Sequence, residues 1–369
     1  MKKILFIVTE FPPGPGGIGN HAWNLARNIN KKIPIDVLAV SDYADYEMCE
    51  SFDENEKYLI YRFKRYWLSL FTYLHRMFII IKFLIKNEYS HCIVSGFFSL
   101  LTIISIKILN KNIIVCSVLH GSELIHSNPI IKYILSKNLK KIDILISVSN
   151  YTNSLIPLEL SREQKSYIIP NGVNKNLYKA SSFNYNIIGN PCLLTVGSIT
   201  HRKGQINLIN ALPLIKKKYP DVHYHCVGLP IEEDSIAQLI KSLQLDDYVT
   251  LHGVIGNNRL GDFYKNADIL VMLSQSNIDS CAEGFGIAIL EANLFGTSAI
   301  GSKDTGIEDA IYQNKTGILV DPYCSKEILS SIDNILSNKQ FFSKNSKAWA
   351  KEHFWNNITE KYLKVMFNE

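Results

Sequence analysis

Two carboxylates eight residues apart flank a glycine-rich segment that leads into a helical pattern. The segment reads Glu283, Gly284, Phe285, Gly286 and Ile287, and the apolar pattern behind it carries Glu291. Glycine lets the backbone approach a ligand, and the first N–H groups of a helix have no intrahelical partner. A diphosphate fits such a helix start, and carboxylates accept hydrogen bonds from sugar hydroxyls. The alternative is that the two carboxylates serve only the helix dipole.

Two neighbouring cations follow another predicted strand. Residues 197–204 read Gly197, Ser198, Ile199, Thr200, His201, Arg202, Lys203 and Gly204. A guanidinium offers a planar fork and an ammonium a point charge, so the pair can neutralise a leaving diphosphate. The alternative is a solvated surface pair, but the position at the carboxyl end of a strand favours a functional interpretation.

A further glycine-rich segment, residues 14–19, follows the first predicted strand. It reads Gly14, Pro15, Gly16, Gly17, Ile18 and Gly19, which matches Gly-x-Gly-x-x-Gly, and Asp42 comes just after the second predicted strand. In a dinucleotide-binding fold an acid at that place binds a ribose, so an NAD-dependent oxidoreductase is an alternative function. Pro12, Pro13 and Pro15 stiffen the loop beyond a pyrophosphate-binding turn, which favours a site for another anion or a sugar.

His120 follows the predicted strand at residues 113–119 and precedes Gly121. A histidine at the carboxyl end of a strand is placed to bond a substrate hydroxyl or carbonyl. Single histidines are more often structural, so both interpretations stay open.

Short β-branched segments alternate with amphipathic segments in two series, as βαβ units do. Predicted strands lie at 4–8, 37–40, 92–94, 113–119 and 144–148, and then at 193–196, 223–227, 249–251, 269–273, 298–300 and 317–320, with helical patterns at 205–219 and 287–295. The sequence therefore predicts an α/β protein of two domains, residues 1–170 and 171–350. The polar stretch Lys175–Asn190 is the expected hinge.

Composition narrows the class of protein. The 369 residues are 47% apolar and 20% charged, which suits two α/β domains. Seven scattered cysteines without metal-ligand spacing predict reduced thiols and no metal site. The N-terminus lacks the long apolar core of a signal peptide, which predicts a cytoplasmic protein. The net charge of +5 comes from residues 57–87, with seven basic residues and no acid, which argues against a nucleic-acid partner.

The basic stretch also has a helical period. Between residues 65 and 86, polar residues recur every three or four positions and leave an apolar sector of Trp67, Leu70, Phe71, Leu74, Phe78 and Ile81. Arg76 and Lys82 interrupt this cationic amphipathic helix too centrally for a transmembrane span. Two interpretations stay open: Lys57–Lys86 contacts an anionic membrane surface, or the helix is a core helix with one solvated stripe.

Together these motifs resemble glycosyltransferase family 4, a retaining family with the GT-B fold. The resemblance covers nearly the whole chain and rests on residues 12–19, His120 with Gly121, residues 169–173, residues 196–204 and the Glu283 and Glu291 pair. It implies two Rossmann-like domains that face a cleft. The acceptor side would be residues 1–170 and the nucleotide-sugar side residues 171–350, with a helix at 351–369 crossing back to the first domain.

The resemblance also implies roles for individual residues. The donor sugar and phosphate would be bound by Glu283 and by the backbone of Gly284, Phe285, Gly286 and Ile287. Glu291 would bind the ribose, Lys203 with Arg202 would bind the diphosphate, and Gly197, Ser198 and Ile255 would contact other parts of the nucleotide. Gly16 and Gly17 would bind the donor from the opposite domain, and His120 would sit by the transferred sugar. Ser198 stands where the family usually has Arg, so a non-catalytic nucleotide-sugar-binding member is a further alternative. The insert Ser274–Ala282 is similar to the branch that includes phosphatidylinositol mannosyltransferases.

The expected activity is anomer-retaining transfer of a hexose-type sugar from a UDP-, GDP- or ADP-sugar. The expected acceptor is a glycan or a lipid-linked molecule, in cell-surface polysaccharide or lipopolysaccharide synthesis. No cofactor is expected. Because the sequence has no Asp-x-Asp triplet, a metal clamp on the diphosphate is not expected either.

Overall fold

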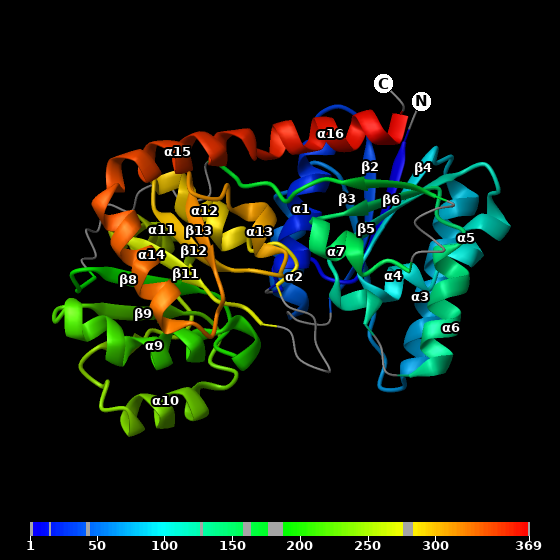
Figure 1. Ribbon diagram of the computed structural model, residues 1–369. Coiled ribbons are helices and arrows are strands. Elements are labelled where there is room, and N and C mark those ends of the chain that lie inside the picture. Colours follow the sequence, from blue (N-terminus) through cyan, green and yellow to red (C-terminus); the bar gives the residue numbers. More distant parts are fainter. Residues whose placement is uncertain are drawn as a thin grey trace. The chain divides into compact units, whose positions relative to one another are not determined.

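A computed structural model describes residues 3–14, 16–41, 45–125, 128–157, 164–175, 187–275 and 283–367. Asp42, Cys281, most of the predicted hinge and most of the insert before Glu283 lie outside these ranges. The chain forms two compact units, residues 1–171 with 355–369, and residues 172–354. In Figure 1 the strands of the first unit run from blue through cyan to green, and those of the second unit from green to orange.

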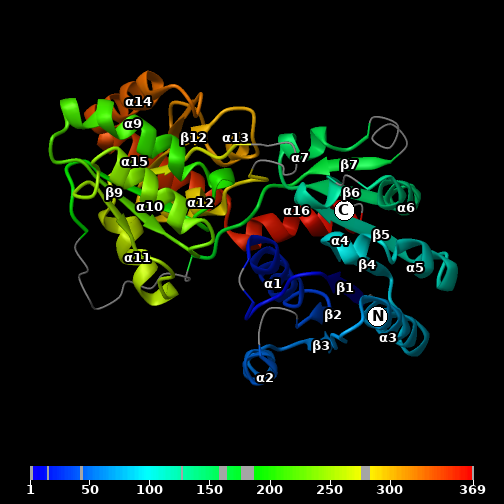
Figure 2. The ribbon, with the colours of Figure 1, turned by 90° about the horizontal axis from the view of Figure 1, so that it is seen from below.

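The first unit contains a parallel sheet. Its strands are β1 (Ile4–Val8), β2 (Ile35–Val40), β3 (Leu59–Phe63), β4 (His91–Ser95), β5 (Ile114–Leu119), β6 (Ile144–Ser147) and β7 (Lys165–Ile168), in the order β3-β2-β1-β4-β5-β6-β7. Its helices are α1 (Gly17–Ile29), α2 (Tyr46–Glu54), α3 (Ser69–Lys86), α4 (Phe97–Leu100), α5 (Ile103–Leu109), α6 (Pro129–Leu139), α7 (Asn150–Ser154) and α16 (Trp355–Phe367), with a 3-10 turn η1 (Ser122–Leu124). Figure 2 shows α1 and α16 on one side of the sheet and α3, α5 and α6 on the other.

The second unit repeats this plan. Its parallel sheet has the order β10-β9-β8-β11-β12-β13, made of β8 (Cys192–Val196), β9 (His223–Val227), β10 (Val249–Leu251), β11 (Ile269–Met272), β12 (Ser298–Ser302) and β13 (Gly317–Val320). The 3-10 turn η2 (His201–Lys203) precedes α9 (Gln205–Lys218), and α10 (Glu233–Ser242), α11 (Asn257–Asn266), α12 (Ile287–Phe295), α13 (Ile307–Ala310), α14 (Ser325–Ser337) and α15 (Lys339–Glu352) follow. Helices α9, α10 and α14 pack together, as do α11, α12 and α15.

The predicted α/β fold with two Rossmann-like sheets is confirmed, and every predicted strand forms. All residues of β1 and β2 are buried, because helices cover both faces of a parallel sheet and such strands become continuously apolar. The sequence did not predict β3 and β7. Both are edge strands with mostly half-exposed or exposed residues, and polar residues interrupt them, Arg62 in β3 and Lys165 with Ser166 in β7, so neither forms a continuous apolar segment.

The cysteines behave as predicted where the structure describes them. All six are free thiols, and all except Cys324 are buried. Burial raises the pKa of Cys192 and Cys226 to about 12, so neither forms a reactive thiolate at neutral pH.

Helix α16 completes the first unit. Ile358, Tyr362 and Met366 on its inner side are buried, and α16 packs along α1. The Tyr362 hydroxyl lies 3.2 Å from His21 Nε2, and His91 Nε2 lies 2.9 Å from the carbonyl oxygen of Met366. Residues from the end of the chain therefore fill the apolar layer over β1 and β4.

We expect the substitution Ile358→Ala to lower the free energy of unfolding by about 2–5 kcal/mol, because Ile358 is fully buried and its removal leaves a cavity. The midpoint of thermal unfolding checks this, with exposed Lys361→Ala on the same helix as the matched control. Equal midpoints for the two variants would mean that α16 contributes no packing energy.

Candidate functional site

The loop after β8 holds the two cations. The Thr200 side chain caps η2 by accepting a hydrogen bond of 3.3 Å from the Lys203 N–H. Gly204 then takes a left-handed conformation (φ 77°), and a Cβ at this position would lie 1.7 Å from the Leu273 carbonyl oxygen. Only glycine fits there, so the loop after β8 lies directly against the chain that leaves β11.

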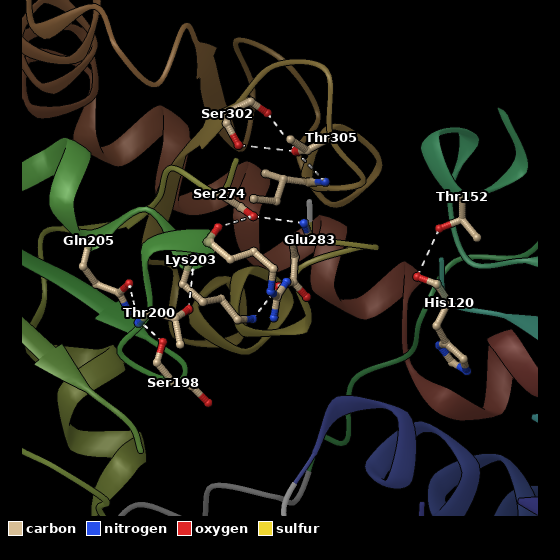
Figure 3. Close-up of polar contacts among 12 residues, drawn as sticks. His120, Thr152, Ser198, Thr200, Lys203, Gln205, Ser274, Glu283, Ser302 and Thr305 are labelled. Atoms are coloured by element: carbon tan, nitrogen blue, oxygen red, sulfur yellow. Dashed lines mark hydrogen bonds and ion pairs between the residues drawn. The ribbon is translucent and has the colours of Figure 1, made fainter. Parts of the chain in front are cut away.

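Ser274 joins this loop to the carboxylate. Its hydroxyl donates to the carbonyl oxygen of Arg202 at 2.9 Å and accepts from the Glu283 N–H at 2.9 Å. The Glu283 carbonyl oxygen in turn accepts from the Gly306 N–H at 2.9 Å. Figure 3 shows Ser274, Lys203 and Glu283 together at this point. Because β8 and β11 are neighbours where the strand order reverses, the site lies at the topological switch point, where open α/β sheets bind ligands.

The charged side chains form one cluster. Lys203 Nζ bonds directly to Glu283 Oε2, and Arg202 Nη1 lies 3.5 Å from the same oxygen. The Lys203 and Glu283 side chains are 15% and 18% exposed and that of Arg202 is 36% exposed, so an approaching anion has access to the guanidinium. Burial alone would raise the pKa of Glu283, but Lys203 and then Arg202 outweigh it and hold that pKa below its ordinary value.

The start of α12 lies beside Glu283 in the chain. Gly286 is the N-cap residue, in a left-handed conformation (φ 86°), and makes no side-chain cap hydrogen bond. The buried Phe285 side chain anchors the segment. Because the N-cap residue is a glycine, no N-cap side chain bonds to the first N–H groups of the helix. A helix start next to two cations favours a negatively charged group.

Glu291 lies in the second turn of α12. Its Oε2 accepts a hydrogen bond of 2.6 Å from the hydroxyl of Tyr264, a buried residue of α11 whose ring stacks on Phe295. This contact fixes the position of the carboxylate, whose oxygens are hydrogen-bond acceptors. Ile255 is half-buried in the loop between β10 and α11.

Gly197 and Ser198 form the first part of the cation loop. Gly197 donates to the Val227 carbonyl oxygen at 2.8 Å, and the Ser198 carbonyl oxygen accepts from Gln205 Nε2 at 3.0 Å. Gly197 has a φ of 149°, which residues with a side chain rarely adopt, whereas a Cβ there would make only ordinary contact with the Lys203 side chain at 3.5 Å.

In the first unit, His120 is buried and its Nε2 lies 3.1 Å from the Ser95 hydroxyl. The backbone N–H of His120 donates to Glu123 Oε1 at 2.6 Å, and the His120 carbonyl oxygen accepts from the Thr152 hydroxyl at 3.4 Å (Figure 3). The His21 ring packs edge-on against it, with centroids 4.9 Å apart. Burial lowers the pKa of His120 to about 4, so at neutral pH it is an uncharged hydrogen-bonding group.

The glycine loop before α1 holds a carboxylate of its own. Glu10 accepts a hydrogen bond from the Gly19 N–H, while burial raises the pKa of Glu10. A Cβ on Gly16 would lie 2.6 Å from Glu10 Oε2, whereas one on Gly17 would meet nothing within 4 Å. The carboxylate sits where a pyrophosphate would bind, so this helix start suits hydroxyl groups rather than a dinucleotide.

The sequence therefore pointed to the charged residues but missed those that hold them. Thr200 accepts from the Lys203 N–H, Ser274 accepts from the Glu283 N–H, and Tyr264 donates to Glu291. Glu10 accepts from the Gly19 N–H in the glycine loop, and the His21 ring packs against His120. Of these, only Thr200 carried a signal, because a threonine before a short basic turn is a common N-cap. The other contacts join residues far apart in the chain.

Comparison with known proteins identifies similar sequences and similar folds. A family model described as glycosyl transferases group 1 matches residues 180–353. A GDP-mannose-dependent alpha-(1-6)-phosphatidylinositol monomannoside mannosyltransferase of Mycobacterium tuberculosis is 22% identical over 92% of this chain and 90% of its own length. Among solved structures, the sucrose-phosphate synthase of Thermosynechococcus elongatus has a TM-score of 0.82 at 20% identity, covering 100% of this chain and 99% of that one. HepE of Anabaena, solved with UDP and glucose, has a TM-score of 0.79 at 20% identity, covering both chains completely.

The second unit, with its cations and carboxylate at the switch point of a GT-B fold, is that of a nucleotide-sugar glycosyltransferase. The family model spans slightly less than half of the chain but almost all of the second unit, so the second unit is a group 1 glycosyltransferase domain. This sets aside the NAD-dependent oxidoreductase, which also conflicts with the Glu10 carboxylate at the start of α1.

We expect the substitution Glu283→Gln to lower the free energy of unfolding at pH 7 by about 1–3 kcal/mol, because Lys203 and Arg202 lose their shared carboxylate. The folded pKa of Glu283 lies below its ordinary value of 4.5. The stabilisation of the folded state by this carboxylate is therefore fully present above pH 4.5 and is lost as pH falls through the folded pKa of Glu283. The difference between wild type and variant should shrink below about pH 4.5.

Thermal unfolding midpoints from pH 7 to pH 3 measure this difference. Asp246→Asn, which removes an exposed carboxylate of the same unit, is the control and should differ little from wild type throughout. A difference for Glu283→Gln that stays constant down to pH 3 would contradict the ion pair.

Proposed function

We propose that this glycosyltransferase moves a hexose-type sugar from a nucleoside diphosphate sugar to a glycan or lipid-linked acceptor, with retention of the anomeric configuration. The observation that carries the proposal is the cluster of Arg202, Lys203 and Glu283 at the switch point of the second sheet, next to the start of α12. Two cations and a helix start make an anion site, and the carboxylate beside them accepts hydroxyl groups.

In this proposal the second unit, residues 171–350, binds the donor. Lys203 and Arg202 bind the diphosphate, as do the N–H groups near Gly284, Phe285, Gly286 and Ile287. Glu283 accepts hydrogen bonds from the sugar and Glu291 from the ribose. The backbone of Gly197, Ser198 and Ile255 contacts the rest of the nucleotide. Arg202 provides the charge that the family usually places at the position of Ser198, which argues against a non-catalytic member.

The reaction breaks the bond between the anomeric carbon and the diphosphate oxygen. The acceptor oxygen bonds to that carbon on the same face, and the acceptor hydroxyl gives its proton to the departing diphosphate. Negative charge develops on the departing diphosphate. Cations and N–H groups that are already in place stabilise it without reorganisation, an effect often worth several kcal/mol. No step requires a metal in this proposal.

For the first unit, residues 1–170 with the terminal segment 351–369, we propose the acceptor side. Gly16, Gly17 and His120 would act at the sugar end of the donor, as the family resemblance implies. His120 is uncharged at neutral pH, so its role would be to hydrogen-bond a hydroxyl or carbonyl group and not to supply a positive charge.

The acceptor and the pathway are proposed from the relatives. The Mycobacterium tuberculosis relative uses GDP-mannose and a phosphatidylinositol mannoside, and another solved neighbour is a lipopolysaccharide outer core galactosyltransferase. We therefore propose a role in cell-surface polysaccharide or lipopolysaccharide synthesis at the cytoplasmic side of the membrane. In the described part of the chain, no helix is both long and apolar enough to cross a bilayer.

A thermal-shift panel of UDP, GDP, ADP and their sugars tests donor binding, because a ligand that binds only the folded state raises the unfolding midpoint. We expect one nucleotide series to raise it, and Lys203→Ala to weaken that binding about 10-fold to 100-fold, a loss of about 1.4–2.7 kcal/mol. Lys241→Ala, an exposed lysine on α10, is the control and should bind like wild type. No shift with any nucleotide would overturn the proposal.

Once the donor is known, His120→Ala should lower kcat for donor hydrolysis or sugar transfer at least tenfold while nucleotide diphosphate affinity stays within twofold. The reason is that His120 is assigned to the sugar and not to the diphosphate. The product's anomeric configuration, read by NMR, tests retention. A variant that loses nucleotide affinity but keeps kcat would place His120 elsewhere in the mechanism.

A further inference from the structure

Helix α3 presents its apolar side to solvent. The exposed residues along it are Leu70, Phe71, Leu74, Phe78 and Ile85, and Trp67 just before it is 91% exposed. With 100° between successive residues, the five helical positions fall within one sector about 100° wide. Exposed apolar residues that gather in one sector mark an interaction surface, whereas single ones do not.

The opposite side of α3 is buried and includes two polar residues. Thr72 and Arg76 are buried with Ile79 and Ile80. The Arg76 guanidinium lies over the ring of Phe98, 5.0 Å from its centroid, so aromatic packing accommodates this charge inside the unit. The interpretation of α3 as a core helix with a solvated polar stripe is therefore wrong, because the stripe that faces solvent is the apolar one.

The cations near this surface divide into two groups. Arg62 forms a two-pronged ion pair with Asp53, at 2.7 and 3.0 Å, and Arg76 is buried, so both serve the fold. Lys64, Arg65, Lys82 and Lys86 are exposed. No acid lies between residues 57 and 87, and the carboxylate that follows is Glu88, two residues after Lys86, so cations outnumber acids along the apolar sector.

We propose that α3 and residues 64–68 form a docking surface for an anionic membrane. The helix lies parallel to the bilayer, with Trp67, Phe71 and Phe78 at the boundary between head groups and acyl chains, while the four exposed cations contact anionic head groups. An anionic membrane explains why exposed apolar residues and exposed cations occur on one surface better than a second copy of the chain does. A symmetric dimer through this surface would bring the cations of the two copies together. The surface does not depend on which sugar the enzyme transfers.

Cosedimentation of the full-length protein with vesicles tests the docking surface. One set of vesicles is phosphatidylcholine alone, and the other contains about one third phosphatidylglycerol. We expect at least tenfold tighter binding to the anionic set, with affinity falling as salt rises. Lys82→Glu with Lys86→Glu should abolish the preference for anionic vesicles, and Leu74→Gln with Phe78→Gln should weaken binding to the anionic set at least tenfold.

Matched controls place the same changes on the other unit. Lys217→Glu with Lys241→Glu, and Tyr323→Gln with Phe341→Gln, alter exposed residues of that unit and should bind vesicles like wild type. Equal binding to both vesicle sets, no binding to either, or equal losses in the controls would overturn the proposal. So would a dimer, seen by sedimentation velocity, that Leu74→Gln with Phe78→Gln dissociates while vesicle binding is absent. Nucleotide-induced thermal shifts of the α3 variants should match wild type, which separates this outcome from a failure of the proposed reaction.

Discussion

The close approach of two loops at the switch point of the second sheet is the constraint on which the site depends. Gly204 touches the Leu273 carbonyl oxygen, and Ser274 bonds to both loops. Arg202, Lys203 and Glu283 come from positions about 80 residues apart in the chain, yet this contact sets their spacing. Any side chain larger than hydrogen at residue 204 would push the loops apart, and the cluster would separate with them.

Pairing between Lys203 and Glu283 has a second effect. A lone lysine would sample many rotamers in solvent, and ordering it would cost entropy when an anion arrives. Glu283 holds the ammonium group in place beforehand, while Arg202 keeps part of its guanidinium accessible. The site is thus organised before a ligand enters. The carboxylate also limits the net positive charge, so that the cluster stays stable without an anion.

Most of the fold and the charged site residues could be predicted from the sequence, for identifiable reasons. Parallel strands are buried on both faces and leave continuous apolar segments, and loops at their carboxyl ends carry glycines and charges together. Edge strands β3 and β7 lack such segments. Ser274, Tyr264 and Glu10 hold other site residues in place, but no sequence motif marks them, because each acts through a tertiary contact. For α3 the period was correct, but a period cannot say which side faces outward, so the burial of Arg76 and the exposure of the apolar sector had to come from the structure.

Helix α16 has a consequence for how the chain is made. The first unit takes its final helix from residues 355–369, whereas the second unit is contiguous at residues 172–354. During synthesis the segment up to residue 171 must wait on the ribosome with the apolar side of α1 uncovered, while the later segment already has all its parts. Completion of the first unit therefore depends on residues that are synthesised after the whole of the second unit.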